Sequence, residues 1–396
     1  MEVVVGTLHH YPWGSTTLLP RFLGLDDQAK PWAELWFGAH PLGPTFFPDG
    51  SSILTRMGAA PDRVLGKEVV ATFGTRLPYL LKLISPDRPL SLQVHPSKRE
   101  AEEGYAREVA AGVDLASPRR QFRDANHKPE LVYALTPFEA LSGFRAPRRA
   151  GEILSQLASP LGRELAKLIE RYPGHRGLEH VTRRLLDPSL RPDPGDVEAT
   201  VAAAAERLRA GVSPSVRADR TVLALARSYP GDPAAILALV LNPVTLRPGQ
   251  TLFTPAGSPH CYLHGLGVEI MADSDNVLRA GLTTKYVDAQ AALAHMTFVG
   301  APPVRIAPEE IRPHTKVFYA PVDDFELTLT TVNRRGDSLA VPGRGPRLIL
   351  VIDGEVKAES GGRTCALARG EAAFVEAEDG PLRVSGRGRL VQAGVP

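Results

Sequence analysis

The sequence contains few cysteines and no long apolar run. Among its 396 residues are two cysteines, Cys261 and Cys365, too few for a disulfide framework. No apolar stretch approaches the roughly 18 residues that span a bilayer. The N-terminus also lacks the basic and then apolar pattern of a signal segment. These absences predict a cytoplasmic protein that does not interact with membranes.

A strong charge of either sign is also missing. The chain has 46 basic and 44 acidic residues, a net charge of +2, and no concentrated lysine tract. Nucleic acid is therefore not an expected partner. With 43% apolar and 23% charged residues, the composition is that of an ordinary globular protein. The length predicts roughly two or three domains.

Hydrophobic patterning predicts mainly β structure in the first part of the chain. Residues 1–95 carry short strand-like runs broken by turns, which favours a mostly β region. A helix is predicted over Lys98 to Val113, and a further strand over Leu131 to Leu135. The early strand-like runs are Val3–Val5, Leu35–Gly38, Leu77–Ile84 and Leu90–Val94.

The pattern becomes helical in the middle of the chain and returns to β afterwards. Leucines at three- and four-residue steps, with proline and glycine clusters between them, predict several short helices within residues 147–241. We therefore expect a discontinuous β domain, 1–146 with 242–315, and an inserted helical subdomain, 147–241, that walls one side of the site. A second β module is expected over 316–396, where apolar and polar residues alternate between glycine-rich turns.

Four separated residues predict a metal site. A Gly/Pro-punctuated turn ends at His260, and Gln93 and His95 alternate across one residue so that both leave the same face of a strand. Glu130 would add a carboxylate. Two imidazoles, a carboxylate and an amide oxygen suit zinc, with iron or manganese as competitors. Without a thiolate ligand, and with room for water, such a site would be catalytic. A lone histidine is more often a buried, hydrogen-bonded core residue, so the prediction depends on the joint pattern.

These motifs resemble those of a known family. Gly249, Pro255-Ala256-Gly257 and His260 fit the second motif of the cupin β-barrels, with His264 in place of its usual terminal asparagine. Gln93-Val94-His95 with a delayed Glu130 departs from the usual first cupin motif and is similar to type I mannose-6-phosphate isomerases. The resemblance covers nearly the whole chain. Further similar segments are Trp13–Ser15, Ala33–Pro41, Asp124–Glu130, Phe138–Arg145, Val268–Glu269 and Ser274–Lys285.

The resemblance implies a fold, a metal and a reaction. It implies a cupin-type β-barrel (jelly roll) catalytic domain and a C-terminal cupin-like module without metal. It also implies one zinc ion per chain, held by Gln93, His95, Glu130 and His260. The implied reaction interconverts mannose 6-phosphate and fructose 6-phosphate, and it would feed carbohydrate metabolism through glycolysis or GDP-mannose and other nucleotide-sugar synthesis. The partner is then a small sugar phosphate, bound by a monomer or weak homodimer.

Roles for individual side chains also follow from the resemblance. An aldose–ketose isomerase needs a base near C1 and C2 and a group that stabilises the enediolate. We rank Glu269 first as the proton shuttle, expect Lys128 to stabilise the oxyanion, and give His127 a role in ring opening. Asp275 is a further candidate base, equally consistent with a plain surface charge. Arg279, also a catalytic candidate, is expected to hold the phosphate together with Lys285 and Ser91.

Residue chemistry alone leaves other functions open. It indicates only a metal-dependent enzyme that acts on a small, oxygenated and anionic molecule. A metal-dependent cupin oxygenase would use the same kind of site, since fold does not fix function. A non-catalytic sugar-phosphate sensor would need the pocket but not the proton-transfer groups. Cys261 adjoins His260 but should face the opposite side of its strand, so it is expected to be a small buried residue.

Overall fold

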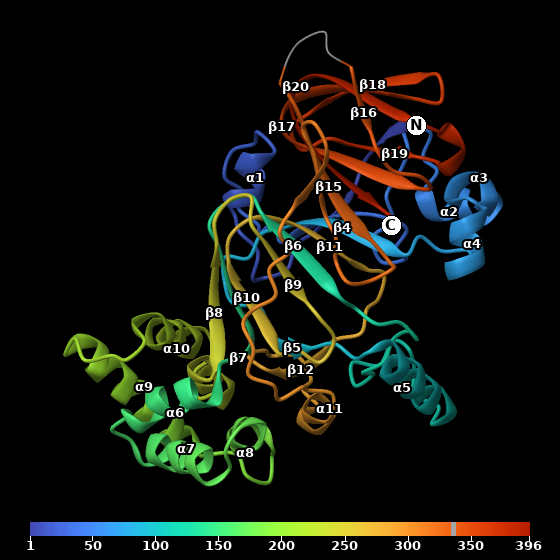
Figure 1. The fold of residues 1–396 in the computed structure, drawn as a ribbon. Helices are drawn as coiled ribbons and strands as arrows, with labels where there is room; N and C mark the ends of the chain where they lie inside the picture. Colours follow the sequence, from blue (N-terminus) through green and yellow to red (C-terminus); the bar gives the residue numbers. More distant parts are fainter. Residues whose placement is uncertain (334–337) are drawn as a thin grey trace.

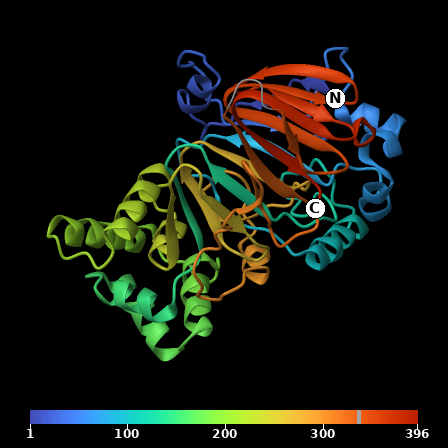
Figure 2. The same ribbon diagram turned by 45° about the horizontal axis from the view of Figure 1, so that its top comes forward.

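The computed structural model describes residues 1–333 and 338–396. Its strands pair antiparallel in a six-, a five- and a nine-stranded sheet, which confirms the predicted mainly β fold with a helical insertion. Figure 1 shows the two smaller sheets near the middle of the molecule. The green and yellow helices lie at one end and the red C-terminal strands at the other, and Figure 2 shows the same separation from a second direction.

The six-stranded sheet has one face in the interior of a barrel and the other in a separate apolar core. Every residue of its strand β4 is buried, because both faces of the sheet are covered. Leu81, Leu131 and Ile270 on the outer face pack against C-terminal residues such as Phe325. The strand order is β2 (Thr7–His9), β3 (Glu34–Phe37), β4 (Tyr79–Ile84), β11 (Gly267–Ala272), β6 (Glu130–Ala134) and β9 (Thr251–Thr254).

The five-stranded sheet is covered on its outer face by the helical insertion. Val94, Leu141 and Leu278 from the sheet share one core with Leu165 and Val222 from the helices. The strand order is β12 (Leu278–Gly281), β5 (Leu92–Val94), β10 (His260–His264), β7 (Phe138–Phe144) and β8 (Leu241–Leu246). The helical elements are α6 (Pro147–Ser155), α7 (Pro160–Arg171), α8 (His175–Leu186), α9 (Pro194–Arg209), α10 (Val216–Ser228) and η1 (Pro233–Leu239).

The nine-stranded sheet consists of C-terminal strands and one strand from the start of the chain. Strand β1 (Glu2–Val4) pairs with β19 (Ala372–Val375), so the first residues are part of the C-terminal sheet. Residues 334–337, within the β module predicted from the sequence, lie outside the described residues. The remaining strands are β13 (Glu309–Arg312), β14 (Thr315–Phe318), β15 (Glu326–Val332), β16 (Leu339–Val341), β17 (Arg347–Ser360), β18 (Arg363–Ala368) and β20 (Leu382–Gly394).

The space between the two smaller sheets has an apolar part and a polar part. Val132 from the six-stranded sheet and Phe138 and Tyr262 from the five-stranded sheet belong to one small core. Polar residues on the same inner faces are left beside this core, and they include Glu130 and His260. The layers therefore run from the helices through the two sheets of the barrel to the C-terminal sheet, with the polar side chains enclosed between the barrel sheets.

The expectation that residues 1–95 are mostly β is wrong. Four short helices occupy much of this region: α1 (Leu18–Phe22), α2 (Ile53–Ala59), α3 (Pro61–Leu65) and α4 (Lys67–Phe73). Local signals account for them, since Ser52 caps α2 in a capping box with Thr55 and Pro61 begins α3. The predicted helix after Ser97 is confirmed as α5 (Lys98–Ala110). Two further short helices are α11 (Ala289–Ala294) and η2 (Ala377–Asp379). None of the helices in the described ranges is long and apolar enough to cross a membrane.

Candidate metal centre and active site

Three of the predicted metal ligands converge between the two barrel sheets. The Nε2 atoms of His95 and His260 lie 3.2 and 3.4 Å from the two carboxylate oxygens of Glu130, and the ligand atoms of the group lie within 4.8 Å of one another. All three residues are almost completely buried. Both Nε2 atoms and Glu130 Oε2 nevertheless have no hydrogen-bond partner among the described residues. Buried polar atoms are rarely left unpaired, so this trio has the character of a ligand set.

Backbone carbonyl groups orient the two imidazole rings. His95 follows β5, and its Nδ1 donates to the Asn276 carbonyl at 2.7 Å. His260 begins β10, and its Nδ1 donates to the Ser258 carbonyl at 3.0 Å. Because a carbonyl only accepts, each ring carries its proton on Nδ1 and presents Nε2 as the free acceptor. Gly257, at a φ of +75°, donates to the His95 carbonyl at 2.8 Å and joins the turn to β5.

The electrostatics of the cluster also suit a cation. Burial lowers the pKa of His95 to about 4, although the charge of Glu130 opposes this shift. Burial would raise the pKa of Glu130, but His95 and Lys128 hold it well below its usual range. The donor set is therefore a neutral imidazole at His95, a second Nε2 acceptor at His260 and an ionised carboxylate. Such mixed nitrogen and oxygen donors fit zinc.

Gln93 and Arg279 extend the site along the five-stranded sheet. Gln93 in β5 lies directly opposite His260 in β10 and opposite Arg279 in β12. Residues directly opposite in antiparallel strands project from the same face. The amide of Gln93 therefore lies on the face that carries His260, with the guanidinium of Arg279 one strand further along. This register places the fourth predicted ligand next to the trio.

The candidate proton shuttle Glu269 belongs to a buried group of three charges. It lies in β11 opposite Lys82 of β4, and the Lys82 ammonium is 3.7 Å from Glu269 and 3.6 Å from Glu34. Burial and the negative charge of Glu130 raise the pKa of Glu269 to about 7, although Lys82 lowers it. Burial opposes the charge on Lys82, but Glu34 and Glu269 raise its pKa. Glu269 can thus both take up and release a proton near neutral pH.

The other catalytic candidates occupy different surroundings. The Lys128 ammonium lies 3.5 Å from Glu130 Oε1, beside the metal cluster. Asp275 lies 3.2 Å from His40 Nε2, and the charges of Lys128 and Lys82 also act on it. His127 instead donates from Nε2 to Asp324 in the C-terminal part of the chain, at 2.7 Å. The structure therefore brings Lys128 to the cluster and directs His127 toward the C-terminal sheet.

The two cations predicted to bind phosphate, Arg279 and Lys285, lie near each other and near Arg123. Partial burial lowers the pKa of Arg279, and the charge of Arg123 lowers it further. Lys285 is more exposed, with its ammonium 5.6 Å from the ring centre of Tyr11. Partial burial and then the charges of Arg279 and Arg123 lower the pKa of Lys285. Ser91 is half-buried just before β5. Neighbouring cations of this kind are suited to an anion such as phosphate.

Sequence reasoning missed several residues at the site. Glu34 accepts a hydrogen bond from Trp36 Nε1 at 2.9 Å, and the Lys82 ammonium lies 4.7 Å from the centre of the Trp36 ring. His40 packs edge-on against that ring. Trp36 lies in a run predicted as a strand, and both Trp36 and His40 lie in a segment similar to the family's, but neither was assigned a role. Lys82 carried a usable signal, because it is the one charged residue in an otherwise apolar strand. Arg123, whose charge acts on Arg279 and Lys285, was also not predicted from the sequence.

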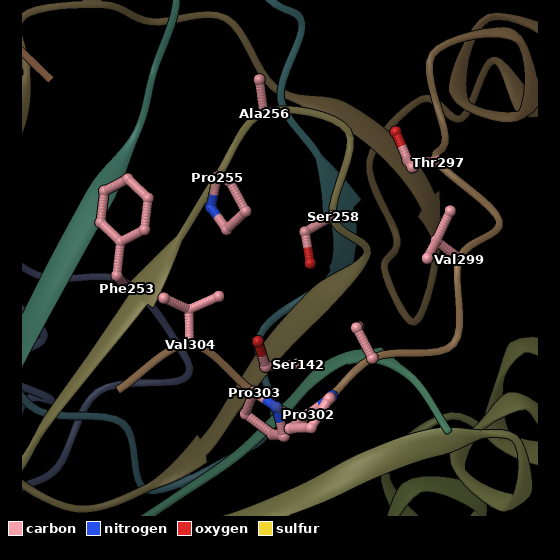
Figure 3. Close-up of a pocket in the computed structure, with 12 residues that line it drawn as sticks. Ser142, Phe253, Pro255, Ala256, Ser258, Thr297, Val299, Pro302, Pro303 and Val304 are labelled. Atoms are coloured by element: carbon pink, nitrogen blue, oxygen red, sulfur yellow. The ribbon is translucent and has the colours of Figure 1, made fainter. Parts of the chain in front are cut away.

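An uncharged pocket of about 150 Å³ lies beside the turn that carries His260. Its lining, shown in Figure 3, includes Ser142, Ser258 and Thr297 together with apolar residues. Among the described residues, no lysine, arginine, histidine or acidic side chain lines it. A sugar phosphate needs cationic partners, so this pocket does not match the ligand expected for the metal centre. The predicted buried position of Cys261 is confirmed.

Comparisons with known proteins agree with this geometry. A model of the phosphomannose isomerase type I catalytic domain matches residues 3–147, and one of the mannose-6-phosphate isomerase cupin domain matches residues 314–394. The mannose-6-phosphate isomerase of Escherichia coli strain K12 is 34% identical over 99% of both chains. Mannose-6-phosphate isomerase 1 of Arabidopsis thaliana is 31% identical and covers 97% of this chain and 91% of its own length.

Solved structures give the same result. A mannose 6-phosphate isomerase bound with zinc and yttrium superimposes with a TM-score of 0.90 at 32% identity, over 100% of this chain and 99% of the other. The apo form of the Salmonella typhimurium enzyme gives the same TM-score, identity and coverage. The likeness therefore extends through the barrel, the helices and the C-terminal sheet.

Proposed function

This chain belongs to the type I mannose-6-phosphate isomerase family, and we propose that it interconverts mannose 6-phosphate and fructose 6-phosphate with a bound zinc ion. One observation carries the proposal. Two histidine Nε2 atoms and a carboxylate oxygen are buried between the barrel sheets with no hydrogen-bond partner in the described chain. A family member of known structure binds zinc, which agrees with this donor set.

We assign one zinc ion per chain to Gln93, His95, Glu130 and His260. When bound, zinc supplies Lewis-acid stabilisation to an oxygen that gains negative charge during the reaction. The carbonyl groups of Asn276 and Ser258 fix the tautomers of the two histidines, so the ligands are arranged before the metal arrives. Such preorganisation reduces the cost of assembling the site.

Proton transfer between C1 and C2 is assigned to Glu269. Burial keeps its pKa near 7, which balances proton removal against proton return at physiological pH. Lys82 lies close enough to stabilise the ionised form. Lys128 is assigned to the developing enediolate oxygen, since its ammonium already lies beside Glu130. Asp275 is a second candidate base, and its contact with His40 keeps it in ionised form.

Substrate binding is assigned to the cations at the edge of the site. Arg279, Lys285 and Ser91 would hold the phosphate, and Arg123 adds positive charge nearby. Arg279 is opposite Gln93 in the sheet, so a phosphate bound to it stays within reach of the metal. The sugar would then extend from the cations toward Glu269 and Lys128.

We further propose how the chain divides into domains, where the protein is located and how many chains associate. Residues 1–146 and 242–315 would form the catalytic domain, 147–241 the inserted subdomain and 316–396 a C-terminal cupin-like domain without metal. The pairing of β1 with β19 would join the first and last of these. Two unpaired cysteines are consistent with a cytoplasmic protein, and we expect a monomer or weak homodimer.

A coupled assay of mannose 6-phosphate conversion to fructose 6-phosphate tests the function. The purified protein is assayed as prepared, after chelation, and after zinc is restored. Chelator-sensitive turnover that zinc rescues is expected. Absence of turnover in zinc-loaded protein would overturn the proposal. Oxygen consumption would then point to the oxygenase, and binding without conversion to the sensor.

A further inference from the structure

The C-terminal part of the chain contacts the segment that carries two active-site residues. Asp324 lies between β14 and β15, far in sequence from His127, and its Oδ2 accepts a hydrogen bond from His127 Nε2 at 2.7 Å. The side chain of Asp324 is 6% exposed and that of His127 is 23% exposed. A carboxylate that accepts from a ring nitrogen away from bulk water makes a strong, directional contact.

Asp324 is held in place by the core behind it. The next residue, Phe325, is completely buried, and Phe318 is 1% exposed. The Phe318 ring packs edge-on against Tyr133, with ring centres 5.6 Å apart. Tyr133 belongs to β6, the strand that begins with Glu130. The C-terminal sheet and the strand of Glu130 are therefore packed together, and Phe325 anchors the backbone next to Asp324 in that core.

His127 lies in a short segment with contacts in two directions. Asn126, just before it, is 2% exposed and donates to the Asp273 carbonyl at 3.2 Å. Lys128, just after it, points its ammonium to Glu130 at 3.5 Å. His127 itself turns to Asp324. The segment is thus fixed to the catalytic domain through Asn126 and to the C-terminal domain through His127, immediately before the residues that contact the metal cluster.

We propose that Asp324 is a positioning residue of the active site. Its hydrogen bond to His127 ties the C-terminal domain to the segment of Lys128 and Glu130 and so holds the Lys128 ammonium in place. The C-terminal domain, which contains none of the four proposed zinc ligands, thereby completes the catalytic geometry. His127 acts as the tether in this arrangement, which differs from the ring-opening role expected from the resemblance. The inference rests on the proposed isomerase function.

Steady-state kinetics of the full-length, zinc-loaded protein tests this role. Asp324→Ala should lower kcat about 10-fold with KM changed by less than about threefold, because small misplacements of catalytic groups reduce the rate of the chemical step. Asp324→Asn keeps an acceptor oxygen and should stay within about threefold of wild type. Asp323→Ala is the matched control, since Asp323 is exposed next to Asp324, and it should match wild type.

Variants of His127, which donates the hydrogen bond to Asp324, complete the experiment. His127→Ala should resemble Asp324→Ala, and the double variant should be no slower than either single variant. His127→Gln keeps an N–H donor and should recover most of the activity. Rates are expressed per bound zinc, so loss of metal is separated from loss of positioning. His127 is partly exposed, so its substitution should disturb folding less. If Asp324→Ala does not fold, the comparison of His127→Ala with His127→Gln therefore tests whether this hydrogen bond positions the active site.

Three results would overturn the inference. These are wild-type kcat in Asp324→Ala and His127→Ala, an Asp324→Asn variant as slow as Asp324→Ala, and independent losses that multiply in the double variant. A much larger loss in His127→Ala than in Asp324→Ala would assign ring opening to His127. A wild-type protein without isomerase activity would instead contradict the proposed function itself.

Discussion

At the scale of single residues, two buried carboxylates share the ammonium group of Lys82. Glu34 and Glu269 lie 3.6 and 3.7 Å from its Nζ, and all three side chains are less than a tenth exposed. Burial and the negative charges of Glu130 and Glu34 raise the pKa of Glu269, although the Lys82 ammonium lowers it. This arrangement explains how a carboxylic acid is available for proton transfer at neutral pH.

Replacing Lys82 should change both stability and the pH profile. Lys82→Met leaves the two carboxylates without their buried counter-ion and should cost roughly 3–5 kcal/mol of unfolding free energy. Because Lys82 lowers the pKa of Glu269, its loss should also move the acid limb of kcat/KM to higher pH. Denaturant unfolding and a pH series measure the two effects. Lys316→Met on the exposed surface of β14 is the control. Equal unfolding free energies and pH profiles in the two variants would contradict this role of Lys82.

The protonation state of Glu269 predicts how activity depends on pH. Its folded-state pKa is raised to about 7, so the ionised base disappears as the pH falls through that value. We expect kcat/KM to fall about tenfold per pH unit below 7. Glu269→Gln should retain zinc but lose most of its turnover at every pH. Near-normal turnover with zinc bound would remove Glu269 as the shuttle.

Single residues also show which parts of the site a sequence reveals. His95, Glu130 and His260 were recognisable because each stands in a motif with a fixed spacing. Lys82 and Glu34 were not assigned, because their function depends on strand register: Lys82 meets Glu269 only through the pairing of β4 with β11. The contact of His127 with Asp324 joins residues 197 positions apart in the sequence, so no local sequence pattern predicts it.

At the scale of elements, Asn276, which lies between β11 and β12, connects the loops around the metal site. Asn276 is completely buried, and its amide donates to the carbonyl groups of Asp124 and Asn126, each at 2.8 Å. Its Oδ1 accepts from the Arg123 backbone at 2.7 Å. Its own carbonyl accepts from His95. The loop over residues 123–126 and a metal ligand are thus positioned by the same residue.

Removing the Asn276 side chain should weaken the metal site without touching a ligand. Asn276→Ala keeps the carbonyl but frees the loops that hold it in position. We expect zinc affinity to fall 10- to 100-fold, roughly the effect of losing an outer-shell partner. Unfolding free energy should fall by about 1–3 kcal/mol, since several buried groups lose partners. Competitive zinc titration measures the first effect, and unchanged affinity would show that the loops are held by other contacts.

Elements differed in how well the sequence predicted them. The apolar runs that form β3 to β6 and the helical pattern of residues 147–241 were predicted, whereas β7, β11 and β12 lie in segments noted only for their resemblance to the family. The short helices α2 to α4 were not, because segments of five to seven residues show too little periodicity to outweigh the strand-like runs around them. Their signals were the capping residues and turn glycines, such as Ser52 and Gly66, rather than the hydrophobic pattern.

At the scale of the whole molecule, the metal site lies at the centre of a layered structure. Helices cover the outside of one barrel sheet, and the C-terminal sheet covers the outside of the other. Glu130 and His260 come from different sheets of the barrel and meet at 3.4 Å. Zinc would therefore link the two sheets and neutralise a buried negative charge, which couples metal binding to folding.

Metal removal should accordingly lower thermal stability. A ligand that binds only the folded state adds about 4 kcal/mol when its free concentration is about 1,000 times Kd. We expect the chelated protein to unfold at a lower temperature and zinc to restore the transition. Glu130→Gln should show a much smaller zinc-dependent shift, whereas Glu139→Gln, on the exposed side of β7, should behave as wild type. A transition independent of zinc would contradict the coupling.

A stepwise zinc titration of metal-free protein tests whether the buried cluster is the zinc site of an isomerase. Mannose 6-phosphate isomerisation and bound zinc are measured on the same samples. We expect turnover to rise in proportion to bound zinc and to level off at one ion per chain, with little rise in Glu130→Gln. Full turnover in metal-free protein, or zinc bound at this stoichiometry without any isomerisation, would contradict it.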